Sequence, residues 1–195
     1  MKYLLRLTII PIVYIFFIDF ISIGLDSLDT IGEVAKIIIN ALCLILYGYV
    51  VFKIMQKEGE EAGSYLIKNN YTRREMIRTG NVVEIKTAKE YRWWKGFATG
   101  LLCLVPLFVC LVWHLIIRTP NENSPASIIA QLIYVLFYRF LGSYQDSAPS
   151  TIFYGLPIAI IGMELITGVP YILGAVKRRK QQEKIKELER ELHGE

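Results

Sequence analysis

One carboxylate near the middle of a long apolar stretch is the residue best placed to do chemistry. Glu164 is the only charged side chain within residues 152–176. An acid at the centre of a membrane costs several kcal/mol unless it is paired or hydrated, so it needs a partner or a role. Gly168 follows one turn later, and Pro157 and Pro170 flank the acid. Helices of this kind occur at transporter ion sites and also where helices pack closely, so proton handling and a packing role both stay open.

A second polar pair is predicted between the first two apolar stretches. Asp19 lies about seven residues from the end of the first stretch, and Asn40 about six residues into the second. At a rise of about 1.5 Å per residue, both lie roughly 10 Å deep in an antiparallel hairpin. The Asn40 amide can then donate to Asp19, which favours an interhelical hydrogen bond over an aqueous pathway.

The remaining candidates do not form a catalytic or metal-binding set. His114 and Arg118 share a helical face, but His114 has no other ligand at metal-binding spacing. The sequence has no phosphate-binding loop, zinc-protease motif, serine-hydrolase motif or Cys-x-x-Cys pair. We therefore predict no metal, no cofactor and no enzymatic activity.

The elements that carry these residues are long apolar segments. The composition is 53% hydrophobic and only 21% charged, with the charges concentrated in residues 53–95 and 177–195. A membrane-spanning helix needs about 20 apolar residues. Four segments qualify, at about residues 7–25, 34–54, 96–117 and 152–176. The sequence thus predicts an all-α integral membrane protein with a four-helix transmembrane bundle in residues 1–176.

A fifth apolar segment, residues 126–142, is short and amphipathic. Its polar side chains repeat every three or four residues and form one stripe, which consists of Ser127, Gln131, Tyr134 and Tyr138. We expect an additional helix on the outer face, either interfacial or re-entrant.

The distribution of lysine and arginine predicts the orientation. With four spans and a cytoplasmic N-terminus, all but three of the 22 basic residues lie on the cytoplasmic side, the exceptions being Lys36, Arg118 and Arg139. This agrees with the positive-inside rule, whereas a fifth span at 126–142 would place the basic cluster after Val176 outside. We expect a multi-pass protein of the cell membrane with both termini in the cytoplasm.

The basic residues beside the spans predict contact with a bilayer that has anionic headgroups, and not with nucleic acid. The expected headgroup anchors form two groups, Arg92, Trp93, Trp94 and Lys95 before the third span, and Lys177, Arg178, Arg179 and Lys180 after the fourth.

The cytoplasmic loop, residues 55–95, contains two capping-box patterns. Thr72 with Glu75 predicts a short helix that begins there and ends near Gly80, and Thr87 with Glu90 predicts a helix running into the third span. Gly96 and Gly100 predict close contact between that span and a neighbouring helix.

The tail, residues 177–195, is helical in composition. Ile185, Leu188 and Leu192 have the spacing of a coiled-coil seam, but they cover little more than one heptad. A charged helix that continues the last span into water is the favoured interpretation, and self-association through the seam stays open.

Three functional hypotheses follow. The first is a non-catalytic accessory, assembly or partner-binding membrane component that contacts a protein partner or forms a homo-oligomer. The second is a small transporter or channel subunit that uses Glu164 and Asp19, and the third is a lipid-modifying enzyme.

Overall fold

The computed structural model describes residues 2–26, 32–106, 108–109 and 149–193. These residues form the helices α1 (Lys2–Asp26), α2 (Glu33–Thr79), α3 (Trp94–Cys103) and α6 (Pro149–His193), with a short 3-10 turn, η1, at Thr87–Lys89. The described residues contain no β-strand. The predicted all-α class is therefore confirmed.

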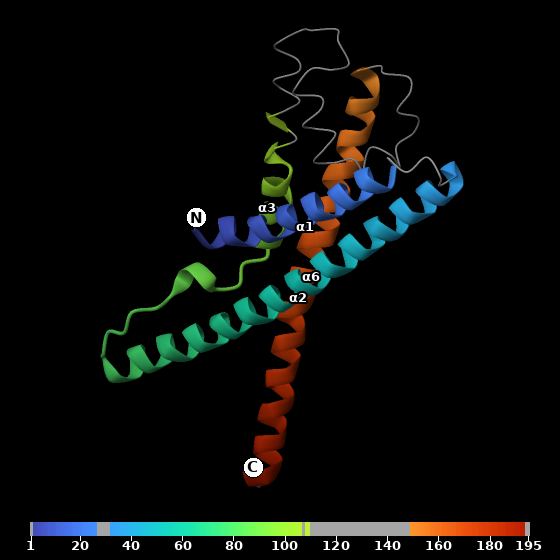
Figure 1. The fold of residues 1–195 in the computed structure, drawn as a ribbon. Helices are drawn as coiled ribbons and strands as arrows, with labels where there is room; N and C mark the ends of the chain where they lie inside the picture. The colour runs from blue at the N-terminus through green and yellow to red at the C-terminus, as the bar shows by residue number, and fades with distance from the viewer. Residues whose placement is uncertain (1, 27–31, 107, 110–148, 194–195) are drawn as a thin grey trace.

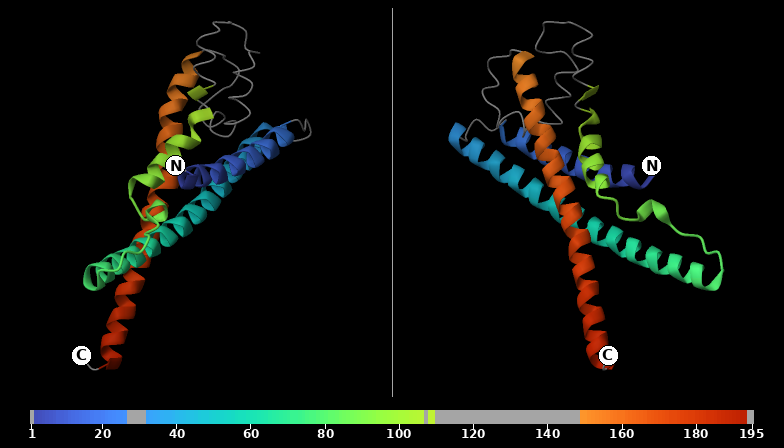
Figure 2. Two further views of the ribbon diagram at one scale, coloured as in Figure 1. Left: turned by 90° about the vertical axis from the view of Figure 1, so that its left-hand side faces the viewer. Right: turned by 180° about the vertical axis from the view of Figure 1, so that it is seen from behind.

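The helices form two antiparallel pairs that cross each other (Figure 1). α1 runs alongside α2 in the opposite direction, and α3 does the same with α6. The two long helices, α2 and α6, make the most extensive contact and cross obliquely in every view (Figure 2). The core of the molecule lies around this crossing.

α2 is much longer than the predicted span at 34–54. It continues without a break through 47 residues, about 70 Å at the usual helical rise. The helix predicted to begin at Thr72 is therefore wrong, because the Thr72 hydroxyl donates to the Lys68 carbonyl oxygen one turn earlier, at 3.1 Å, inside α2. Residues 55–79, the α2 extension, contain no proline and many good helix formers, so nothing local ends the helix.

The end of α2 matches the sequence prediction. Gly80 has a φ of +73°, and its amide donates to the Met76 carbonyl oxygen at 2.9 Å. This left-handed conformation suits glycine and closes the last turn of the helix. Residues 80–93 then run back along α2 as an irregular strap.

The second capping box does not open the third helix. Thr87 begins only the single turn η1, and α3 starts at Trp94. The Glu90 side chain bonds to α2 and not back to the strap backbone, so the box pairing never forms. The prediction of one helix from Thr87 into the third span is therefore wrong.

α6 joins the predicted fourth span and the tail into one helix of 45 residues. The helix is continuous at Pro157 and Pro170. The tail is thus helical and continuous with the apolar segment before it, as the sequence predicts.

α3 packs closely on α6, as the glycine spacing predicts. A methyl group added at Gly96 would lie 3.0 Å from the Gly168 Cα, and one added at Gly100 would lie 3.2 Å from the Glu164 Cα. A methyl group at Gly168 would in turn overlap the Phe97 ring. These three glycines let the two backbones approach.

Two helices are long and apolar enough to cross a membrane, in the segments Val34–Thr79 and Ile160–Leu192, and Tyr3–Ile18 is a shorter apolar helix. Only 17% and 39% of the most apolar windows of the two long segments are buried, whereas the core helix of a soluble protein would be mostly buried. Residues 107 and 110–117 of the predicted third span and all of residues 126–142 lie outside the described residues.

Candidate functional site

The crossing of α2 and α6 is built on glycines from both helices. A methyl group added at Gly59 would overlap the Tyr171 carbonyl oxygen, and one added at Gly174 would overlap the Gln56 carbonyl oxygen. At Gly63, one turn further along α2, an added methyl group would lie 3.3 Å from the Ala175 Cα. Only glycine allows the two backbones to lie this close.

The strap packs onto this crossing through tyrosine. The Tyr91 ring stacks on the Tyr171 ring with 5.6 Å between centroids, and the Tyr91 amide donates to the Ala62 carbonyl oxygen of α2 at 3.1 Å. Burial raises the pKa of the Tyr91 hydroxyl above its ordinary value. Tyr91 thereby connects the strap to both long helices.

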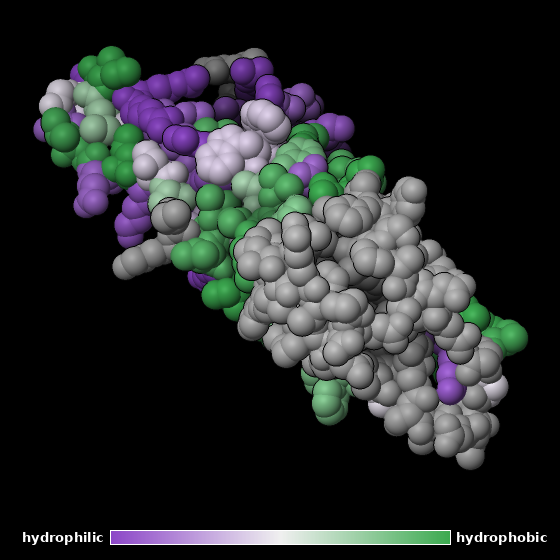
Figure 3. Space-filling view, turned by 90° about the horizontal axis from the view of Figure 1, so that it is seen from above, coloured by the Kyte–Doolittle hydropathy of each residue, from purple (hydrophilic) through white to green (hydrophobic). Residues whose placement is uncertain are grey.

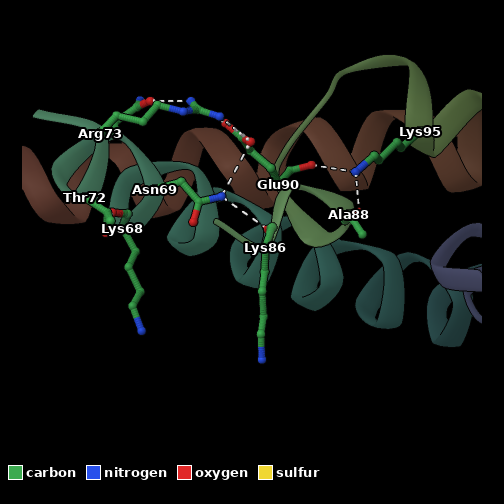
Figure 4. Close-up of polar contacts among 9 residues, drawn as sticks. Lys68, Asn69, Thr72, Arg73, Lys86, Ala88, Glu90 and Lys95 are labelled. Atoms are coloured by element: carbon green, nitrogen blue, oxygen red, sulfur yellow. Dashed lines mark hydrogen bonds and ion pairs between the residues drawn. The ribbon is translucent and has the colours of Figure 1, made fainter. Parts of the chain in front are cut away.

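A buried carboxylate fixes the middle of the strap to the α2 extension. Glu90 is only 6% exposed and accepts two hydrogen bonds from the Arg73 guanidinium, at 2.9 and 3.0 Å. The Asn69 amide, also buried, donates to the same carboxylate at 3.5 Å and to the Lys86 carbonyl oxygen at 3.3 Å. Figure 4 shows these groups converging from α2 and the strap. A bidentate arginine–carboxylate pair restricts both position and orientation.

Lys95 differs from what its sequence position suggests. We expected it to face lipid headgroups, but it is 5% exposed, and its ammonium donates to the Ala88 and Glu90 carbonyl oxygens at 2.8 and 2.7 Å (Figure 4). Burial, together with the nearby Arg92, lowers the pKa of Lys95 below its ordinary value. The ammonium therefore caps the backbone carbonyl oxygens within and just after η1.

The start of α1 joins the same cluster. The Lys95 ammonium also lies over the Tyr3 ring, 5.3 Å from its centroid, and the Tyr3 hydroxyl donates to Glu58 of α2 at 3.1 Å. The strap, α1 and the α2 extension are thus connected by polar contacts on one side of the helix crossing. We call this set of contacts, centred on Tyr3, Arg73, Glu90, Tyr91 and Lys95, the junction.

Next to the junction, two basic residues of α6 make contacts with α2. Lys177 pairs with Glu60 at 2.8 Å, and the Arg178 guanidinium donates to the Ser64 hydroxyl at 2.8 Å. Arg179 pairs only with Glu183 in its own helix. Lys177 and Arg178 are therefore engaged within the chain. Arg179 and Lys180 are exposed, and the predicted role of all four residues as headgroup anchors stays a prediction.

The aromatic group before α3 is exposed. Trp93 is 64% exposed and packs edge-on against Phe97, and both Trp94 and Arg92 are exposed as well. Such positions agree with a place at a headgroup layer, a role that stays a prediction.

The polar candidates inside the apolar segments are placed only in part. Glu164 is half-buried on α6, and the described residues offer its carboxylate no hydrogen bond or ion pair. Asn40 is buried, while the side chain of Asp19 lies outside the described residues, so their pairing stays a prediction. Also outside them are His114 and the polar stripe, Ser127, Gln131, Tyr134 and Tyr138.

Sequence reasoning missed the junction. The Gly59-x-x-x-Gly63 spacing is a signal that could have pointed to the crossing of α2 and α6. The roles of Glu90 and Lys95 had no such signal, because their partners depend on how the strap folds back on α2.

The charged side chains of the junction are bonded within the chain. The described residues contain no group of histidine, cysteine and acidic side chains able to hold a metal ion. The Glu90 carboxylate is paired with Arg73, and the Lys95 ammonium donates to backbone carbonyl oxygens.

Comparison of the chain with protein-family models, curated proteins and solved structures finds no match.

Proposed function

We propose that this chain is a multi-pass membrane protein whose junction and α2 extension form a cytoplasmic platform that binds another protein. The proposal combines an apolar body with a polar platform, and each part has its own support. The chain acts here as a non-catalytic accessory or assembly component.

The apolar surface supports the membrane part of the proposal. Large apolar side chains are exposed along one face of α1 and along the first half of α2, among them Phe17, Phe20, Ile37, Ile38 and Ile45, each more than half exposed. In water such a surface would be costly, whereas lipid solvates it. The excess of basic residues beyond these segments then orients the platform toward the cytoplasm.

The polar end of the molecule is where a partner would bind. Hydrophilic side chains gather at the end where Figure 1 places the α2 extension and the strap (Figure 3). Exposed apolar residues also occur at this end, with Ile77 86% exposed and Val82 92% exposed. Arg74 and Arg78 lie beside them on α2. We call Arg74, Ile77, Arg78, Val82 and Val83 the basic apolar tip.

The tip is the single observation that carries the proposal. The apolar side chains at the tip are exposed to water, which is unfavourable. Binding of another molecule over them would remove this cost. The neighbouring arginines favour an acidic partner surface, because complementary charge speeds encounter and selects the partner.

Purification of the full-length protein from its own membranes in mild detergent tests the proposal. We expect a protein with an acidic surface to co-purify with the wild type, and the double variant Ile77→Ser with Val82→Ser to lose most of it. Glu84→Ser, an exposed change on the same strap, is the matched control and should retain the partner. A wild-type chain that purifies alone at native expression, or a partner retained equally by the double variant, contradicts the proposal.

A further inference from the structure

The end of α6, beyond Arg178, is not covered by any other described element. Beyond Arg178, no hydrogen bond or ion pair joins the described part of α6 to another described element, and the helix points away from the rest of the chain (Figures 1 and 2). Its apolar side chains are exposed, with Ile185 at 49%, Leu188 at 57% and Leu192 at 83%. We infer that this segment, residues 181–193, pairs with the same segment of a second copy as a short parallel coiled coil.

The residue types at the seam favour a parallel pair of helices. With Ile185 at position a of a heptad, Leu188 falls at position d and Leu192 at the next a. A β-branched residue at a with leucine at d favours a parallel dimer over higher oligomers. These three side chains lie on one face, and each would insert between side chains of the second copy.

The charges flanking the seam are complementary between two copies. In the same register, Lys184 occupies position g and Glu189 occupies the following position e. In a parallel dimer the g residue of one helix lies beside that e residue of the other. Two symmetric Lys184–Glu189 pairs therefore form, one on each side of the seam.

The contacts of α6 explain where the pairing begins. Continuing the register backward places Arg178 at an a position and Gln181 at a d position, which are poor seam residues. Arg178 is instead engaged by Ser64 of α2 in its own chain. The run from Lys177 to Lys180 would also repel its counterpart, so the two helices are kept apart until Gln181 and meet beyond it.

The membrane supplies what so short a seam lacks. Little more than one heptad does not hold two free helices together in water. Two chains anchored in one membrane with the orientation proposed above have parallel tails at a high effective concentration, which makes a weak seam sufficient. The parallel direction rests on that proposed orientation, while the face that pairs is given by the exposed side chains themselves.

Cysteine cross-linking of the full-length protein in isolated membranes tests the inference. We expect Leu188→Cys, and independently Ile185→Cys, to give a disulfide-linked dimer under mild oxidation. Arg190→Cys, at the outward position f two residues away, should give none, as should the wild type with its own cysteines. Equal cross-linking of Leu188→Cys and Arg190→Cys, or a cross-link from Leu188→Cys to a different protein, overturns the inference.

Charge reversal provides the second arm of the test. In the Leu188→Cys background, Lys184→Glu should reduce the dimer about five-fold or more, because two attractions become two repulsions. Adding Glu189→Lys should restore it. A double reversal that fails to restore the dimer overturns the inference, whereas loss of the partner bound at the basic apolar tip leaves this readout unchanged and bears only on the proposed function.

Discussion

Glu90 bonds through its carboxylate to two side chains of α2, Arg73 and Asn69. Its carboxylate is buried, while its partner Arg73 is 42% exposed, so the pair is half open to water. Screening reduces the energy of such a pair, but the bidentate geometry and the Asn69 amide add specificity. We interpret Glu90 as the residue that keeps the strap in one position on α2.

Replacement of Glu90 should release the strap without unfolding the helices. We expect Glu90→Ala to weaken its attachment by about 1–2 kcal/mol, because charge-assisted bonds to Arg73 and Asn69 are lost. Faster hydrogen exchange of residues 81–93 in purified protein would report the change. Arg74→Ala, an exposed neighbour of Arg73, serves as the control, and equal exchange in both variants would contradict the assignment.

Lys95 makes the stability of the junction depend on pH. Burial lowers its pKa in the folded chain, so between that lowered pKa and the ordinary value of 10.5 the unfolded chain binds more protons than the folded one. Stability should therefore rise with pH through this window, because the cost of burying the charge disappears. Below the lowered pKa the cost is constant.

Thermal unfolding of Lys95→Met measures this contribution. The variant should lack the part of the rise in stability with pH that comes from Lys95. The melting temperature of the wild type should therefore increase relative to that of the variant as the pH approaches 10.5. Parallel pH profiles for the two proteins would show that Lys95 is not the group responsible. Lys86→Met, an exposed lysine of the strap, should follow the wild type.

At the scale of elements, the long helices depend on glycine where they cross. The backbone carbonyl oxygens of Tyr171 and Gln56 occupy the space that a side chain at Gly59 or Gly174 would need. The same residue type has a different role at Gly48, where an added methyl group would make only an ordinary contact with Ile166, at 3.9 Å. Identical substitutions on one helix therefore separate packing from helix propensity.

Gly59→Ala should destabilise the protein by about 1–3 kcal/mol, because overpacking must push α2 and α6 apart. Gly48→Ala should leave stability unchanged or raise it by up to about 1 kcal/mol, since alanine is the better helix former. Melting temperatures of the two variants in the same detergent give the comparison. A Gly59→Ala variant as stable as Gly48→Ala would show that the backbones are not in contact at this point.

The elements were predictable where the signal is local. The left-handed end of α2 at Gly80 and the close packing of α3 at Gly96 and Gly100 follow from residues next to one another in the chain. The length of α2 did not follow, because the spacing of Thr72 and Glu75 also matches a capping-box pattern. The hydroxyl of Thr72 bonds within the helix instead, to the Lys68 carbonyl oxygen.

At the scale of the whole molecule, one part exposes apolar side chains, which lipid solvates best, and the other part exposes charged side chains, which water solvates best. The first half of α2 exposes isoleucines and leucines, whereas its extension and the last third of α6 carry most of the charged residues of these two helices. Both α2 and α6 pass from one character to the other near their crossing. A membrane surface close to the junction would satisfy both parts.

The orientation can be tested on the tail. A cysteine introduced at Lys186, an exposed position, should react with a membrane-impermeant maleimide only after cells are permeabilised. We expect this result because the excess of basic residues places the tail on the cytoplasmic side of the membrane. The same cysteine in purified, detergent-solubilised protein is the control for reactivity. Labelling in intact cells would reverse the proposed arrangement and the residue roles that depend on it.

The sequence by itself determined the helical, apolar character of the chain. In lipid, a run of about 20 apolar residues has no water to bond its backbone, so the backbone groups must bond within a helix. The tertiary structure alone decided where α2 and α6 meet and which charges the junction buries. Glu90 and Arg73 are 17 residues apart, and Gly59 meets Tyr171 from a different helix. Contacts of this kind depend on how segments fold back on each other, and neither periodicity nor composition encodes that.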